Sequence, residues 1–392
     1  MDFILKEASK LESELIALRR SLHKIPEIGD ELPKTKRFVC EYLDKIGVPY
    51  EEVADCDGIV ATIKGHARGK TVALRADMDA LHLNEDTNLP FRSEIDGQMH
   101  GCGHDAHTAM LLIVAKLLSL HTDKLNGEVK LIFQSGEETG SGAKKVIASG
   151  KIDNVDAVFG IHVGNLAGDD NNVGDIFIKE GAVSAGKDKF TITVKGKGTH
   201  SAFPERGVDP ILISARIVNA CEELIAREVP AGTSAVLSFG SISAGVDHNT
   251  IPSTAVIKGS IRCQDEKIRD FLGERLIELA KGIAQTFRGD AEVDLKRGST
   301  TVMNDSDLAQ FVYNAVKNVY GESVYNNTKS ALMGSDDFAN YASKIPSVYF
   351  FLHTNNGENI CYSNHNPKFD VDESVLIKGV VSYLAIVLNY LK

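Results

Sequence analysis

Short runs of apolar and β-branched residues alternate with longer helical patterns in the first part of the chain. Four such runs predict buried strands: GIVATIK (58–64), TVALRA (71–76), EVKLIFQ (128–134) and AVFGIHV (157–163). Helical patterns lie before and between them, at residues 34–47, 106–120 and 141–150. Nearly continuous apolar strands separated by helices are typical of a mainly parallel sheet that helices cover on both faces. The pattern therefore predicts an α/β fold.

The pattern changes in the middle of the chain. From about residue 186 to residue 298 the order becomes strand, helix, strand, strand, helix, strand. This βαββαβ order is the signature of a ferredoxin-like unit. A further apolar strand (345–353) and a last helix (373–391) follow it. We therefore expect a discontinuous α/β domain, residues 1–185 and 299–392, interrupted by an inserted ferredoxin-like lid domain at residues 186–298.

Composition narrows the class of protein. The chain has 392 residues, 43% hydrophobic and 25% charged, which is enough for two soluble globular domains. A formal net charge of −11 without any basic run argues against a nucleic-acid partner. Leucines recur at helical spacing in residues 11–22, which indicates an amphipathic helix and not a signal peptide, and no apolar stretch approaches the length that crosses a bilayer. We expect a cytoplasmic protein with no membrane partner.

The stretch HGCGHDAHTAMLL (residues 100–112) places three histidines, a cysteine and an aspartate directly before an apolar run. The other five cysteines are dispersed and form no CxxC pair, so neither a zinc knuckle nor a disulfide framework is indicated. Two interpretations fit the stretch alone equally well. Either Asp105 caps a buried helix with its carboxylate, or Cys102 and its neighbouring histidines bind a metal.

Polar side chains of metal-binding type also follow the predicted strands. Because the carboxyl ends of parallel strands meet at one edge of an α/β sheet, we expect these side chains to converge there. Taken singly they have simpler interpretations, as a core histidine, a solvated turn or a capping loop. Together, thiol, imidazole and carboxylate form the donor set that binds zinc, manganese, cobalt or nickel. The residues are Asp77 and Asp79 after the strand at 71–76, Glu137 and Glu138 after 128–134, His162 within 157–163, and His365 after 345–353.

Eight segments resemble, in the same order, the motifs of the metal-dependent aminoacylase/carboxypeptidase amidohydrolases. They are LRADMDAL, MHGCGHDAHTA, FQSGEETGSGA, GIHV, GKGTHSAFPERGVDPI, NTIPSTAVIKGSIR, GSDDFA and HNPKFDVDE. They look most like the branch of hippurate hydrolases and indoleacetyl-amino-acid hydrolases, and the likeness runs from about Arg20 to Glu373. The combination of motifs is highly specific for the family and barely specific for the substrate.

The resemblance implies a centre of two divalent metal ions per subunit: zinc, manganese, cobalt or nickel. Its ligands would be Cys102, which bridges the two ions, with His104, Glu138, His162 and His365. Glu137 would be the general base, and Asp79 would orient a ligand histidine. His107 lies one helical turn from His104 but is not among the family's ligands, so we expect a supporting role for it.

Three further residues of the implied site fall in the inserted domain. His200 in GTHSAF would donate to the oxyanion of the reaction, usually in the partner subunit's site, which requires at least a homodimer formed through the lid. Asn249 and Arg262 would bind the substrate. For Arg262 an ion pair with an acid inside the lid is an equally open alternative.

The implied reaction is hydrolysis of the amide bond of an N-acyl-amino acid, a small molecule. A dipeptidase or carboxypeptidase, or an N-acetyl-diaminopimelate deacetylase, could use the same centre. A binding protein without activity is a further alternative, although it would need neither a base at Glu137 nor a donor at His200. Two positions depart from the family pattern, His82 where proline is usual and Asp336 where glutamate is usual. Both bear on the substrate and not on the metal chemistry.

Overall fold

A computed structural model describes residues 2–164, 171–326, 332–358 and 360–392 of the chain. It divides into two compact units. The large unit comprises Met1–Val183, Val302–Leu332 and Asp336–Lys392, and the inserted unit comprises Ser184–Thr301 with Met333–Ser335. The inserted unit thus takes three residues from the later chain, where the Ala185 amide donates to the carbonyl of Gly334 at 2.8 Å.

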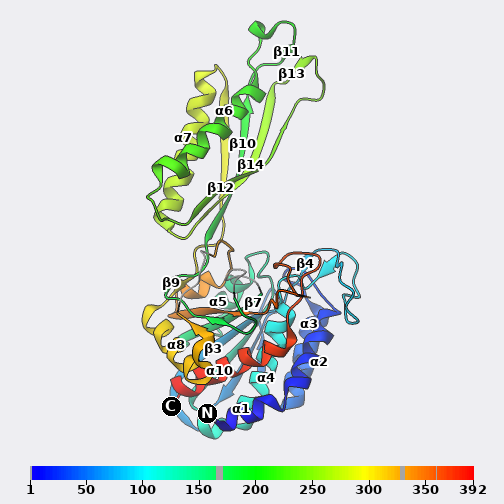
Figure 1. Cartoon of the computed structure of the whole chain (residues 1–392), viewed down its shortest axis with the longest axis vertical. Helices are drawn as coiled ribbons and strands as arrows, with labels where there is room; N and C mark the ends of the chain where they lie inside the picture. The colour runs from blue at the N-terminus through cyan, green and yellow to red at the C-terminus, as the bar shows by residue number, and fades with distance from the viewer. Residues whose placement is uncertain (1, 165–170, 327–331, 359) are drawn as a thin grey trace. The chain divides into compact units, whose positions relative to one another are not determined.

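An eight-stranded sheet forms the centre of the large unit within the described residues (Figure 1). Its order is β1 (Tyr50–Glu52), β2 (Ile59–Lys64), β6 (Asn126–Gln134), β3 (Ala67–Asp77), β7 (Ala157–Gly164), β18 (Ser347–His353), β8 (Ile176–Phe177) and β17 (Val324–Tyr325). The neighbours β6, β3, β7 and β18 are parallel to one another, whereas β2 runs antiparallel to β6. The prediction of a mainly parallel sheet is confirmed, while β2 and the short strands β8 and β17 run the other way.

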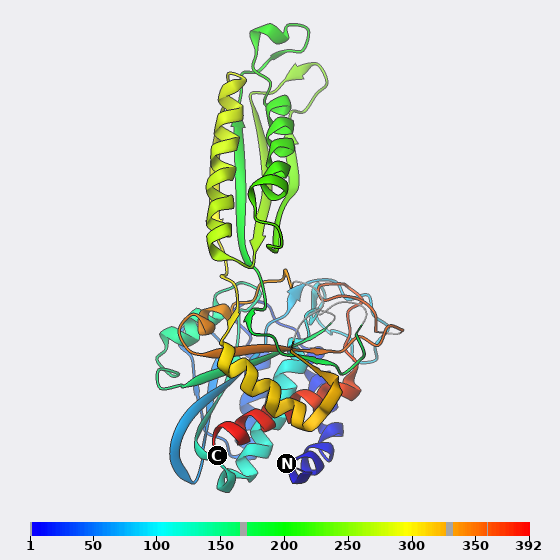
Figure 2. The same cartoon turned by 60° about the vertical axis from the view of Figure 1, so that its left-hand side comes forward.

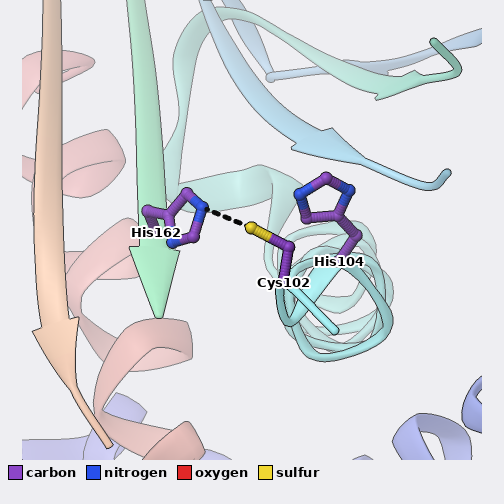
Figure 3. A group of neighbouring side chains, drawn as sticks. All are labelled: Cys102, His104 and His162. Atoms are coloured by element: carbon purple, nitrogen blue, oxygen red, sulfur yellow. Dashed lines mark hydrogen bonds between the residues drawn. The ribbon is translucent and has the colours of Figure 1, made fainter. Parts of the chain in front are cut away.

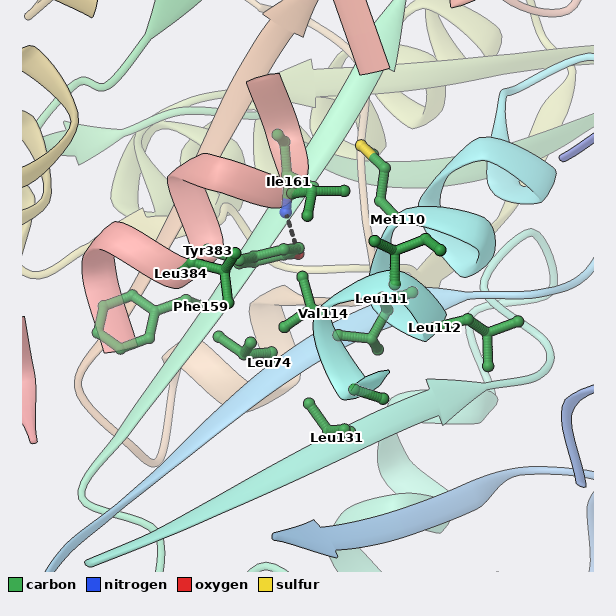
Figure 4. Packing of buried hydrophobic residues seen from close by; sticks show 14 of the residues in the cluster. Leu74, Met110, Leu111, Leu112, Val114, Leu131, Phe159, Ile161, Tyr383 and Leu384 are labelled. Carbon is green, nitrogen blue, oxygen red and sulfur yellow. Dashed lines mark hydrogen bonds between the residues drawn. The ribbon is translucent and has the colours of Figure 1, made fainter. Parts of the chain in front are cut away.

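Successive residues of the parallel strands pack into different layers, because side chains of a strand alternate between its faces. Leu74 and Leu131 belong to one buried cluster, and their neighbours Ala73 and Ile132 belong to another. Figure 4 shows Leu74 and Leu131 packed against the helix that carries Leu111 and Val114. Since both faces of these strands are buried, most positions in their carboxyl halves are apolar, and polar side chains there, such as Arg75, Gln134 and His162, make hydrogen bonds.

Helices cover both faces of this sheet. The longer helices cover the face of the sheet that carries Leu74 and Leu131. Helices α5 and α9 pack on the other face, which carries Ala73 and Ile132. The helices are α1 (Asp2–Ser9), α2 (Glu12–His23), α3 (Pro33–Ile46), α4 (His104–Leu120), α5 (Gly142–Ala148), α8 (Ser306–Tyr320), α9 (Ala339–Ala342) and α10 (Leu376–Tyr390). Helix α4 begins from Gly103, so the interpretation of Asp105 as its N-cap is wrong.

The segment Glu373–Tyr390 is the one helical stretch in the described residues that is long and apolar enough to cross a membrane, with a mean hydropathy of 1.3 over 18 residues. This corrects the expectation that no stretch approaches that length. Buried positions make up 61% of this segment. Tyr383 within it makes hydrogen bonds with two strands of the sheet. The Ile161 amide donates to the Tyr383 hydroxyl at 2.9 Å (Figure 4). The same hydroxyl donates to the Arg75 carbonyl at 2.9 Å. These are the properties of a core helix.

The inserted unit has the predicted βαββαβ order. Its elements are β10 (Gly186–Lys195), α6 (Pro210–Glu223), β12 (Ala235–Ala244), β14 (Thr254–Cys263), α7 (Glu266–Thr286) and β15 (Asp290–Arg297). The sheet order β12-β14-β10-β15 is antiparallel throughout, as in a ferredoxin-like unit. Helices α6 and α7 lie side by side on one face of this sheet (Figure 2). Asp209 and Asp265 cap their N-termini, each accepting from two backbone amides.

Candidate metal centre

A cluster of donor side chains, most of them buried, lies where the parallel strands of the large unit end. The Cys102 Sγ points toward Nε2 of His162 at 3.5 Å, and His104, at the start of α4, lies on the other side of Cys102 (Figure 3). The ligand atoms of these three residues lie within 4.8 Å of one another. The same limit holds for Cys102 with Glu138 and His365, and for His104 with Glu137 and Glu138. The structure therefore brings together all five predicted ligands and the predicted base.

Glycine at position 103 permits this approach of the helix to β7. Gly103 has a φ of +86°, which a residue with a side chain rarely adopts. A Cβ atom at this position would lie 2.5 Å from Cγ2 of Val163. Without a side chain there, the residues on either side of Gly103, Cys102 and His104, can lie against the end of β7.

Hydrogen bonds fix which ring nitrogen each histidine presents to the cluster. Nδ1 of His104 is 2.8 Å from the carbonyl oxygen of Asp79, and Nδ1 of His162 is 2.7 Å from that of Val163. A carbonyl only accepts, so both Nδ1 atoms carry the proton and both Nε2 atoms present a lone pair. Nε2 of His104 is buried and makes no hydrogen bond within the described residues. An unpartnered buried lone pair among thiol and carboxylate groups is what a metal ligand requires.

The charges of the cluster also fit a cation. Burial alone would raise the pKa of the Cys102 thiol, but His162, with His104 and His365, holds it well below its usual range. The contacts of His365 with Cys102 and Glu138 raise its pKa to about 10, and its Nε2 lies 3.2 Å from the Glu138 carboxylate. A thiolate and a carboxylate that favour positive charge on neighbouring imidazoles equally favour a divalent ion in that place.

His107 is excluded from the ligands by its own hydrogen bonds. Its Nδ1 lies 2.5 Å from the Asp77 carboxylate, and its Nε2 accepts from the Val163 amide at 2.9 Å. Because an amide only donates, Nε2 has no lone pair left for a metal. His107 therefore ties the end of β3 to β7, which agrees with the supporting role expected for it.

Asp79 supports the centre in two ways. Its carbonyl oxygen accepts from His104, as described above, and a carboxylate oxygen is 3.5 Å from the same nitrogen. Its two carboxylate oxygens accept from the amides of Glu137 and Glu138, each at 3.0 Å. We expected Asp79 to orient a histidine. Its carboxylate instead holds mainly the turn that presents the two glutamates.

Glu137 is buried beside the donors with a different set of contacts. Its Oε1 is 3.3 Å from the Asp337 amide, which donates to it. Burial raises the pKa of this carboxyl well above its usual range, and the carboxylates of Asp336, Glu138 and Asp337 add to the effect. The turn thus separates the roles of neighbouring residues, because Glu138 faces Cys102 and His365 while Glu137 faces the Asp336–Asp337 segment.

Sequence reasoning missed the role of Arg75. This fully buried guanidinium donates to Gln134, Asp77 and Asp337 at 3.1, 2.5 and 3.0 Å. It is 3.4 Å from Asp336, which also accepts from the Tyr349 hydroxyl at 2.5 Å. The sequence signal that could have indicated this role is an arginine inside an apolar strand, followed closely by two aspartates. The network holds the strand ends that carry the donors.

The remaining predicted residues lie in other places. In the inserted unit, His200 and Asn249 are neighbours, since β11 (Thr199–His200) pairs with β13 (Thr250–Ile251) and the Ser201 amide donates to the Asn249 carbonyl at 2.9 Å. Nη1 of Arg262 donates to the Met333 carbonyl at 2.7 Å. In the large unit, His82 lies exposed on the short strand β4 (Leu81–His82).

A buried carboxylate beside a cluster of metal donors, at the carboxyl edge of an α/β sheet, defines a metal-dependent hydrolase. The sequence matches the Peptidase family M20/M25/M40 over residues 73–389, and the chain belongs to that family. The family resemblance and the fold class expected from the sequence are both confirmed.

Three relatives indicate the range of the family. The chain is 36% identical to N-acetyl-L-cysteine deacetylase of Bacillus subtilis, over 95% of this chain and 86% of the relative. It is 36% identical to thermostable carboxypeptidase 1 of Saccharolobus solfataricus, over 100% of this chain and 99% of the relative. The crystal structure of Bacillus subtilis YxeP, described as a dinuclear metal-binding peptidase of the M20 family, has a TM-score of 0.84 and 32% identity, covering 98% of this chain and 99% of that one.

Proposed function

We propose that the protein hydrolyses the amide bond of N-acyl-amino acids at a centre of two divalent ions, of zinc, manganese, cobalt or nickel. The observation that carries this proposal is the convergence of five metal donors, within 4.8 Å in overlapping groups, beside the buried Glu137. The likeness to a deacetylase of an N-acetylated amino acid supports the substrate class. The residues that would hold the ions are Cys102, His104, Glu138, His162 and His365.

The residues of the chain have separate roles in the proposed reaction. Bound divalent ions supply Lewis-acid polarisation of the scissile carbonyl and activation of water. Glu137 takes one proton from the attacking water and delivers it to the leaving nitrogen, so the base becomes the acid and the amine leaves neutral. The Asp337 amide, 3.3 Å from Oε1, holds the Glu137 carboxylate in place. His200 donates to the developing oxyanion, and Asn249 and Arg262 hold the substrate.

The proposal is tested with hippurate, N-acetyl amino acids and dipeptides, in the presence and absence of a chelator. We expect hydrolysis of the N-acyl-amino acids, loss of activity on metal removal, and recovery on adding back one of the four metals. The readout is release of the free amino group. Activity that survives complete metal removal, verified by elemental analysis, would contradict the proposed centre.

A second candidate is a dipeptidase or carboxypeptidase, which the 36% identity to thermostable carboxypeptidase 1 favours. N-acetyl-diaminopimelate deacetylation would be a narrower form of the first candidate. The chemistry of the metal centre is the same for each candidate, so the candidates are distinguished by which substrate is hydrolysed fastest. Faster turnover of dipeptides than of N-acyl-amino acids would replace the proposed substrate class with the peptidase.

We further propose that the inserted unit forms a homodimer through β12, as a donor acting across subunits at His200 requires. Strand β12 pairs on one side with β14, and no partner on its other side lies within the described residues. Its sequence AVLSFGSISA contains no charged residue, and Ile242 within it is 52% exposed. The opposite edge strand β15 carries the charges of DAEVDLKR. Charged edges resist strand addition and uncharged edges favour it.

Analytical sedimentation, which measures the oligomeric state, tests this interface. We expect a dimer for the wild type and a shift to monomer for Ile242→Lys, because a buried lysine at the paired edge lacks a partner. The matched control Glu292→Lys changes the charge on the other edge strand and is expected to stay dimeric. A wild type that is monomeric at all concentrations, or an Ile242→Lys variant as dimeric as the control, would contradict the β12 interface.

A further inference from the structure

Asn364, which precedes the proposed ligand His365, lies between two other ligand-bearing segments. Its Nδ2 is 3.3 Å from the carbonyl oxygen of Cys102 and 3.2 Å from that of Val163. The same nitrogen is 3.8 Å from the Cys102 Sγ. Carbonyls only accept, so the NH₂ end of the amide must face them. One side chain thus donates to both the cysteine loop and the end of β7.

The carbonyl of Val163 links Asn364 to a second ligand. This oxygen accepts from Nδ1 of His162 at 2.7 Å as well as from Asn364, so both of its lone pairs are used. The contact with Nδ1 is what leaves Nε2 of His162 free to face Cys102. Asn364 therefore fixes the acceptor that sets the orientation of the His162 ring.

The main chain of the next residue, His365, also has an unusual conformation. His365 has a φ of +67°, a conformation uncommon for a residue with a side chain, and its amide donates to the Gly101 carbonyl at 2.7 Å. A Cβ atom on Gly164 would lie 2.2 Å from Oδ1 of Asn364. The absence of a side chain at Gly164 leaves the space that the Asn364 amide fills.

We propose that Asn364 is a positioning residue of the metal centre, which aligns Cys102, His162 and His365 for a common ion. The inference rests on the proposed metal-binding function. The two N–H donors of Asn364 hold the cysteine loop and the end of β7 to the segment that carries His365, and its Nδ2 lies 3.8 Å from the Cys102 Sγ. Hydrogen bonds of this kind orient metal ligands and typically contribute 10–100-fold to metal affinity or activity.

The test compares Asn364→Asp with Asn366→Asp in metal-free protein titrated with cobalt(II). Aspartate keeps the shape of Asn364 but cannot donate to the two carbonyls. Asn366 uses its oxygen to accept from the Lys368 amide at 2.9 Å, which aspartate preserves. Both variants therefore place the same new charge on one loop, and only Asn364→Asp removes donors that make hydrogen bonds within the described residues. Cys102→Ala is the reference for loss of the thiolate ligand.

We expect Asn364→Asp to lower cobalt affinity about 10–100-fold and to weaken or shift the thiolate-to-cobalt absorption band, with the control close to wild type. Thermal unfolding of each metal-free variant shows whether it is folded, and Asn364→Ala provides a second donor-free variant without added charge. Wild-type affinity and an unchanged band in both Asn364 variants would overturn the inference alone. A wild type that binds no metal, or binds it equally well as Cys102→Ala, would overturn the proposed function and the inference with it.

Discussion

Replacing Glu137 by glutamine is expected to lower turnover about 100- to 10,000-fold while leaving bound metal unchanged. Glutamine keeps the side-chain length and an oxygen that can accept from the Asp337 amide, now 3.3 Å from the carboxylate. It cannot take up a proton at neutral pH, so the step in which water loses its proton to Glu137 is removed. Metal retention is expected because the Glu137 side chain faces Asp336 and Asp337, whereas Glu138 faces His365.

The matched variant Glu138→Gln makes the same chemical change one residue later. It is expected to lose metal as well as activity, because it removes the carboxylate that lies 3.2 Å from His365. Turnover is measured with the preferred N-acyl-amino acid, and bound metal by elemental analysis. Unchanged turnover in Glu137→Gln would refute its role as base, and metal loss in that variant would place Glu137 among the ligands. A protein that only binds metal would show no turnover to lose.

The parts of the fold and site that could be predicted depend on local patterns. Buried strands of an α/β sheet are apolar runs, so β3, β6, β7 and β18 are visible in the sequence, and ligands gather at their carboxyl ends. The direction of β2, which lies between β1 and β6, was not visible, because a buried strand that runs antiparallel has the same apolar pattern as a parallel one. The family motifs supplied the division of roles between Glu137 and Glu138, which no local pattern contains.

The supporting contacts could not be predicted, because they join residues far apart in the chain. Arg75 binds Asp337, 262 positions later, and Asn364 donates to Cys102, also 262 positions away. The residues around Arg75 or Asn364 in the sequence do not indicate which distant residue each contacts, since a buried arginine or a loop asparagine can be satisfied by many different partners. Asp105 illustrates the limit. Its residue type and position fit a helix cap, and only the structure shows Arg19 beside it.

Arg19→Met is expected to lower the free energy of unfolding by about 3–5 kcal/mol. Arg19 is fully buried, and it donates to the carboxylates of Asp105, Asp370 and Glu373 at 2.9, 2.7 and 3.1 Å. It thus joins α2 to the first turn of α4, next to His104, and to the chain before α10. Methionine fills much of the space but leaves buried Asp105 without this positive charge, and His23, 2.7 Å away, compensates only in part.

The adjacent Arg20→Met is the control, because the side chain of Arg20 is 47% exposed and its one ion pair within the described residues is with Glu373. An exposed pair of this kind contributes about 0–1 kcal/mol. Urea unfolding of the metal-free variants measures both losses, and equal losses would contradict the role of the buried network.

The pH dependence separates charge from packing in this experiment. Burial opposes ionisation of Asp105, but Arg19 and His23 hold its pKa well below the ordinary value. A carboxyl whose pKa is lowered by folding stabilises the fold above its unfolded pKa of about 4, and this contribution is lost as the pH falls below that value. The difference between wild type and Arg19→Met should therefore narrow below about pH 4. A difference that stays constant there would assign the loss to packing, because the burial of a methionine does not titrate.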